Sequence, residues 1–170
     1  GSADYIETEN NDVGDFSGEL SGAIWFKTSL SGSAQRLIAK DGGSDGRWML
    51  YMDGTDHKLY LFIDDGDNSD NVAINTSAAI NDGKWHHVCF SFKNAEQKLW
   101  IDGVLNSSDT KSLDSSIATS NKLRIGRYAS GSYWNGQVRD VKLFPSVLDD
   151  GGVRKLYSGE NPKKNLNVDV

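Results

Sequence analysis

The chain has 170 residues, of which 18 are basic and 24 acidic, so its formal net charge is −6. No apolar run approaches the ~18 residues of a membrane-spanning helix, and one cysteine can form neither an intrachain disulfide nor a Cys-x-x-Cys zinc site. The acidic balance excludes the basic surface by which proteins bind nucleic acid. We therefore expect one folded domain with a single core, no membrane insertion and no nucleic-acid partner.

Short apolar runs, separated roughly every 8–12 residues by Gly, Asn, Asp and Ser, are typical of an all-β sandwich or barrel. In chain order, strands are expected at residues 4–7, 22–28, 35–40, 47–52, 58–63, 71–75, 85–92, 97–101, 104–106, 122–126 and 137–144. Apolar residues at helical spacing predict a short helix at 148–156. Residues 1–3 resemble a cloning remnant, so we expect a domain over 4–159 and a tail or linker over 160–170.

Three of the expected strands carry different side chains on their two faces, because successive residues of a strand point to opposite sides. Strands 47–52, 58–63 and 97–101 each have one aliphatic face, which should form the core of the sandwich. Their other faces carry Tyr51, Tyr60 and Trp100. This second, aromatic face is either covered by loops or forms a concave surface open to a ligand.

Four segments then carry a recognisable pattern. Residues 82–88 read DGKWHHV, residues 99–103 LWIDG, residues 123–126 LRIG and residues 135–144 NGQVRDVKLF. Their order and spacing resemble the laminin-G-like, concanavalin A-like family, whose β-sandwich is shared by pentraxins and many lectin-like modules. The resemblance covers residues 4–159 and implies a jelly-roll β-sandwich of two antiparallel sheets with one short C-terminal helix.

Two acidic loops, residues 41–46 and 64–71, offer the hard oxygen ligands that calcium prefers. The resemblance implies that Asp45 holds a calcium ion at the rim, and a solvated turn is the alternative. Many relatives hold a second calcium through an aspartate in the last strand, where this chain has Arg139. We predict that this second site is absent and that the guanidinium pairs with the same carboxylates instead.

Sugars bind to aromatic rings together with a few fixed polar groups in a concave site. The candidate ligand-binding residues are Arg47, Tyr51, Tyr60, Trp100, Tyr128, Tyr133 and Trp134. Packing is the alternative for Trp100, Tyr128, Tyr133 and Trp134. If Trp100 contacts sugar, its replacement by alanine should abolish binding with little loss of stability. By the resemblance, Trp25, Trp48 and Trp85 belong to the core.

Catalytic signals are missing from the sequence. Glycosidases of this fold place two carboxylates on one strand about 5 Å apart, in a Glu-x-Asp-x-Glu or Glu-x-Asp-x-x-Glu string, and no such string occurs. His86 and His87 are adjacent in a strand and so point to opposite faces, and no Gly-x-Ser-x-Gly nucleophile elbow is present. Cys89 is expected to be a buried small hydrophobe. We therefore expect no enzyme.

The sequence thus favours a non-catalytic recognition module that binds carbohydrate, with calcium as its one possible cofactor and no organic cofactor. Its many loops and its high content of Asn, Gly and Ser resemble those of modules in phage-tail and surface-attached proteins. This resemblance implies an extracellular, cell-surface or virion location within a larger protein. A protein-binding, adhesion or structural module is the first alternative. A glycan-cleaving enzyme without a recognised motif is the second.

Overall fold

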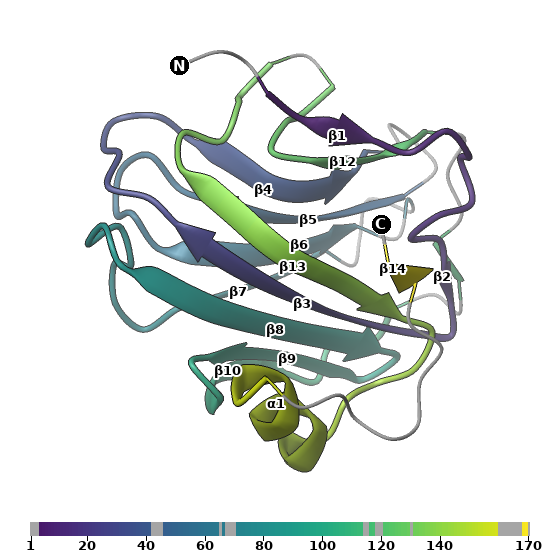
Figure 1. The fold of residues 1–170 in the computed structure, drawn as a ribbon. Coiled ribbons are helices and arrows are strands. Elements are labelled where there is room, and N and C mark those ends of the chain that lie inside the picture. The colour runs from purple at the N-terminus through teal and green to yellow at the C-terminus, as the bar shows by residue number, and fades with distance from the viewer. Residues whose placement is uncertain are drawn as a thin grey trace.

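The computed structural model describes residues 4–41, 46–64, 66, 71–113, 116–117, 121–129, 131–159 and 168–169. Two six-stranded antiparallel sheets lie one on the other (Figure 1). A short two-stranded sheet is not hydrogen-bonded to either of them. The all-β jelly-roll sandwich with two antiparallel sheets is confirmed. Among the described residues, no helix is long and apolar enough to cross a membrane.

Each sheet is assembled from segments that are distant in the sequence. The first sheet has the order β1 (Ile6–Glu7), β12 (Leu123–Ile125), β4 (Gln35–Lys40), β5 (Arg47–Met52), β6 (Leu59–Asp64) and β7 (Val72–Asn75). The second has the order β10 (Val104–Asp109), β9 (Glu96–Ile101), β8 (Trp85–Lys93), β3 (Glu19–Lys27), β13 (Gln137–Phe144) and β14 (Val168–Asp169). The small sheet pairs β11 (Ser116–Ile117) with β2 (Phe16–Ser17).

Most strands fall where the sequence predicts them, with differences at the ends. β3 begins at Glu19, three residues before the expected start, and β10 continues to Asp109. The helix α1 spans Asp150–Tyr157, and the side chain of Asp149 accepts a hydrogen bond from the backbone N–H of Gly152, which fixes its start. Residues 168–169 pair with β13 and thus belong to the second sheet.

The core lies between the two sheets and follows the period-two pattern of the strands. Leu59, Leu61 and Ile63 of β6 are fully buried in it. Trp48 of β5 is buried against Phe90 and donates its indole N–H to the Gly14 carbonyl at 2.7 Å. The expected aliphatic core faces and the core position of Trp48 are confirmed.

The expectation that Trp25 and Trp85 belong to the core is wrong. Ile24 and Phe26 of β3 point inward and are fully buried, so Trp25 between them points outward, where it is half-buried. Trp85 is also half-buried on the outer face of the second sheet. The Arg139 guanidinium lies over both rings, 5.2 Å from the Trp25 centroid and 4.6 Å from that of Trp85.

Helix α1 covers part of this same outer face and creates a second, smaller core (Figure 1). Its members from the sheet are Ala23, Cys89, Trp100 and Phe144, and those from the helix and its approach are Leu148, Val153 and Leu156. The buried position of Cys89 is therefore confirmed. Trp100 is only 1% exposed and donates its indole N–H to the Asp150 carboxylate at 2.9 Å. The interpretation of Trp100 as a ligand contact is wrong, because the helix lies over it.

The two adjacent histidines have structural environments on opposite faces of β8, as expected. His86 lies between the carboxylates of Asp102, 2.8 Å from Nδ1, and Asp82, 3.1 Å from Nε2. Burial lowers the pKa of His86, but the bonds to the two carboxylates outweigh burial and raise it overall. Asp102 also accepts the backbone N–H of His87 at 2.8 Å, and burial lowers the pKa of His87 to about 4.

Candidate functional site

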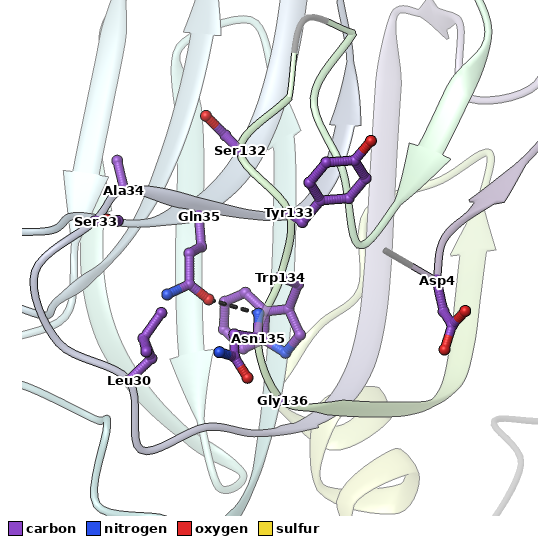
Figure 2. A pocket seen from close by; sticks show the side chains of 10 residues that line it. All are labelled: Asp4, Leu30, Ser33, Ala34, Gln35, Ser132, Tyr133, Trp134, Asn135 and Gly136. Carbon is purple, nitrogen blue, oxygen red and sulfur yellow. Dashed lines mark hydrogen bonds between the residues drawn. The ribbon is translucent and has the colours of Figure 1, made fainter. Parts of the chain in front are cut away.

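An open groove of about 630 Å³ lies where the chain crosses between the two sheets (Figure 2). The β3–β4 loop forms one side of it and the β12–β13 loop the other. Its lining comprises Asp4, Leu30, Ser33, Ala34, Gln35, Ser132, Tyr133, Trp134, Asn135 and Gly136. Two of the residues predicted from the sequence, Tyr133 and Trp134, therefore lie in one groove.

Hydrogen bonds hold the two loops in register and fix the shape of this groove. The side-chain carbonyl of Gln35 accepts the backbone N–H of Asn135 at 2.7 Å, as Figure 2 shows. The Thr28 hydroxyl donates to the Asn135 carbonyl at 2.7 Å, and the Arg36 N–H donates to the Ser132 carbonyl at 3.3 Å. The shape of the groove is therefore held by hydrogen bonds within the chain itself.

Glycine is required at the floor of the groove. A Cβ atom at Gly136 would lie 2.1 Å from the Lys27 carbonyl oxygen and 2.8 Å from Trp134 Nε1. The backbone of the β12–β13 loop can approach β3 this closely only because residue 136 has no side chain.

Two aromatic side chains of the β12–β13 loop have different roles. Trp134 is 8% exposed and packs edge-on against Phe26 at 5.7 Å. Its buried indole N–H has no hydrogen-bond partner among the described residues. Tyr133 is 41% exposed at the rim. The Arg127 guanidinium lies over the rings of Tyr133 and Tyr5, at 5.6 and 4.4 Å. Trp134 thus belongs to the wall of the groove, and Tyr133 offers an accessible ring.

The other predicted tyrosines meet on the outer face of the first sheet. Tyr51 of β5 and Tyr60 of β6 stack at 5.3 Å with an interplanar angle of 17°. The Arg36 guanidinium lies between Tyr51, at 4.8 Å, and Tyr128, at 5.0 Å. We call these four residues the tyrosine–arginine patch. Burial raises the pKa of Tyr51, and the nearby charge of Arg36 opposes that rise.

Arg47 lies apart from that patch. Its guanidinium is over the Phe62 ring at 5.4 Å, and its Nε atom is 3.1 Å from the Asp64 carboxylate. The structure therefore places Tyr133 and Trp134 together in the groove and Tyr51, Tyr60 and Tyr128 together on the outer face of the first sheet. Arg47 and Trp100 belong to neither group. Sequence reasoning missed Gln35 and Arg36, whose roles depend on contacts with the distant β12–β13 loop.

Most of the two acidic loops, residues 42–45, 65 and 67–70, lies outside the described residues. Asp45, the expected calcium ligand, lies outside the described residues. Asp41 accepts hydrogen bonds from Arg124 at 3.2 Å and from the Ala129 N–H at 2.9 Å, and burial raises its pKa against these bonds. Within the described ranges, no three His, Cys, Asp or Glu side chains come together as a metal site. Arg139 contacts tryptophan rings, and its ion-pair partner is the adjacent Asp140 at 3.8 Å.

Residues 1–154 match the family model described as the concanavalin A-like lectin/glucanases superfamily. The chain belongs to this family. The resemblance of the four sequence segments is thereby confirmed. A search of the curated proteins finds no match to the chain.

Solved structures with the same fold are related to this concanavalin A-like domain at low sequence identity. A pentraxin resembling serum amyloid P from Limulus polyphemus has a TM-score of 0.71 at 14% identity, over 94% of this chain and 78% of its own. Domain 4 of an extracellular arabinanase from Geobacillus stearothermophilus, solved with arabinotriose, has a TM-score of 0.64 at 19% identity, over 84% of this chain and 68% of its own.

The binding domain of botulinum neurotoxin DC, solved in complex with rat synaptotagmin II, has a TM-score of 0.65 at 19% identity. The match covers 84% of this chain and 36% of the toxin's binding domain, so this chain spans about a third of that domain's length. Structures of this fold thus include domains that hold a sugar and domains that hold a protein.

Proposed function

We propose that this protein is a non-catalytic recognition module that binds a glycan in the groove between the β3–β4 and β12–β13 loops. The observation that carries the proposal is an open, preformed groove of about 630 Å³ with the exposed ring of Tyr133 at its rim. An aromatic ring beside fixed polar groups matches a sugar, whose C–H faces are apolar and whose edges carry hydroxyls.

The polar groups for those hydroxyls come from both loops. Ser33 and Ser132 contribute hydroxyls, and Asn135 contributes an exposed side-chain amide. The hydrogen bond from the Asn135 backbone N–H to the Gln35 side-chain carbonyl keeps these groups in place, so a ligand does not have to order the loops. The arabinotriose complex of a domain with this fold supports the choice of ligand class. An extracellular, cell-surface or virion location within a larger protein accords with it.

A glycan array probed with and without EDTA tests this function. We expect hits that are lost when Tyr133 is replaced by alanine. Tyr157→Ala is the matched control, because Tyr157 is also 41% exposed but lies on the outer face of the second sheet, stacked on Trp25. Loss of the hits in EDTA would assign a role to calcium, with Asp45→Asn as the variant that should reproduce the loss. An array without hits in either condition would contradict glycan binding.

A second candidate function is protein binding on the outer face of the second sheet. There the Arg139 guanidinium lies on the half-buried rings of Trp25 and Trp85, and Trp and Arg are the side chains enriched in the centres of protein interfaces. An empty glycan array would favour this alternative. Release of reducing sugar from a polysaccharide panel would instead favour an enzyme.

A further inference from the structure

Among the described residues, Arg36, Arg47 and Arg124 lie on the outer face of the first sheet, and of these three Arg36 alone forms no ion pair. Arg47 pairs with Asp64 at 3.1 Å, and Arg124 pairs with Glu7 at 2.7 Å. Arg36 has no such pair among the described residues, and its Nε and Nη1 atoms are buried without a hydrogen-bond partner. A buried cationic donor without a partner is costly, so this guanidinium is prepared to bind an anion.

We propose that Arg36 binds the carboxylate of an acidic sugar residue, which makes an acidic glycan the ligand of this domain. The inference rests on the proposed function and names the chemical class of its ligand. A planar guanidinium matches a carboxylate through two parallel hydrogen bonds, which a neutral sugar cannot offer.

The rings around Arg36 orient the guanidinium and prepare a surface for the sugar. Tyr51 and Tyr128 lie 4.8 and 5.0 Å from its central carbon, so the ring faces hold the cation in place. A carboxylate reaches the buried Nε and Nη1 atoms only when a neighbouring side chain moves aside. Tyr60 stacks on Tyr51 and extends the aromatic surface beyond the arginine. A sugar ring on these tyrosines would carry its carboxylate beside Arg36.

The neighbouring acidic groups determine at which end of the patch the carboxylate would bind. Asp56 accepts the Tyr60 hydroxyl at 2.8 Å, and Asp53 also acts on Tyr51, so negative charge gathers at the Tyr60 end. On the Tyr128 side, the Asp41 carboxylate also interacts with the charge of Arg36, but its hydrogen bonds to Arg124 at 3.2 Å and to the Ala129 N–H at 2.9 Å offset its own charge. An added carboxylate is therefore favoured at the Arg36–Tyr128 end.

The patch and the groove are neighbours through the first two residues of β4. Gln35 contributes its side chain to the groove, and Arg36, the next residue, contributes its side chain to the outer face. The Arg36 N–H also bonds the carbonyl of Ser132, which lines the groove. One oligosaccharide can therefore occupy the groove and reach Arg36 with an acidic residue.

Calorimetric titration of the whole chain tests this inference. The probes are oligomers of galacturonic and glucuronic acid and sialyllactose, each beside its neutral counterpart, which is the carboxyl-reduced oligomer or lactose. We expect at least one acidic probe to bind about tenfold or more tightly than its neutral counterpart, with an advantage that shrinks as salt is added. Arg36→Gln should remove this advantage and leave the neutral affinity within about threefold. Arg36→Lys should keep part of the acidic advantage, because lysine retains the positive charge but cannot form the two parallel hydrogen bonds of a guanidinium.

Arg139→Gln is the matched control, because it removes an arginine that also lies between two aromatic rings but on the opposite sheet. It should leave the acidic advantage unchanged. Equal affinity for acidic and neutral probes, with binding still lost in Tyr133→Ala, would overturn the proposal that the ligand is acidic. The proposal that the domain binds a glycan would remain. An acidic advantage that persists in Arg36→Gln would overturn the assignment to Arg36. Failure of every array glycan and every probe would overturn the proposed function itself.

Discussion

Replacing Trp100 with alanine should destabilise the protein strongly and leave its ligand site intact. The indole is 1% exposed, lies in the small core beneath helix α1 and is fixed by its bond to Asp150. Removing a buried tryptophan costs about 3–5 kcal/mol of unfolding free energy. For a chain of this size each kcal/mol lowers the Tm by about 2–4 °C, so we expect a fall of roughly 6–20 °C.

Trp100→Phe separates the hydrogen bond from the packing. It keeps an aromatic ring under the helix but loses the N–H that Asp150 accepts. Asp150 is exposed and can bind water instead, so this variant should lose only about 1–2 kcal/mol. Urea or guanidinium unfolding gives both free energies, and an unchanged slope of free energy against denaturant would show that the unfolded state is unaffected.

Ligand affinity of the two variants, measured well below their Tm, should equal that of the unaltered protein. The reasoning is refuted if Trp100→Ala melts within about 2 °C of the unaltered protein. It is refuted equally if Trp100→Phe abolishes glycan binding with stability intact, since that would restore the role expected from the sequence.

Three further predictions follow from local contacts. Gly136→Ala should lower the unfolding free energy by about 1–3 kcal/mol and weaken binding in the groove, because the added Cβ would collide with a backbone oxygen. Gly151→Ala in helix α1, where the nearest atom to the added Cβ is 3.4 Å away, should instead stabilise the protein by a few tenths to about 1 kcal/mol. Similar unfolding free energies for the two variants would contradict this prediction. The pKa of His86 is raised above its unfolded value of 6.5, so the stability that His86 contributes is complete below pH 6.5 and is lost as the pH rises through the raised pKa. Between about pH 6 and 9, the unfolding midpoint of His86→Gln should therefore fall less with rising pH than that of the unaltered protein. Burial raises the pKa of the Cys89 thiol, so a thiol reagent should label it only as fast as the protein opens, and rapid labelling of folded protein would show it to be accessible.

Residue alternation within single strands was enough to predict which faces of β5 and β6 are buried. In β5 and β6 the period of two separates Trp48 and Leu61, which are fully buried, from Tyr51 and Tyr60, which face outward. The turn signals between strands and the four family segments located most of the remaining elements. These features are local, because they depend only on the direction of neighbouring side chains and on the backbone freedom of Gly, Asp and Asn.

Alternation alone could not say what covers an outward-facing side chain. Trp100 was correctly placed opposite Leu99, but only the return of helix α1, which brings Asp150 to it, showed that it is buried. Trp25 presents the reverse case: it was expected in the core, but it faces outward and is half-buried, with Tyr157 of α1 stacked on it and Arg139 over its ring. Burial on an outer face depends on elements that arrive from elsewhere in the chain.

The charge of −6 and the single cysteine argue against whole classes of protein, and the order and spacing of four short motifs were enough to indicate the family. The candidate site required the tertiary structure. Gln35 and Asn135 are 100 residues apart and bond at 2.7 Å, and Arg36 lies between the rings of Tyr51 and Tyr128, which come from different parts of the chain. Such contacts depend on strand register and on how two loops pack. A sequence therefore determines which face each side chain occupies, whereas only the folded chain determines which side chains share a site.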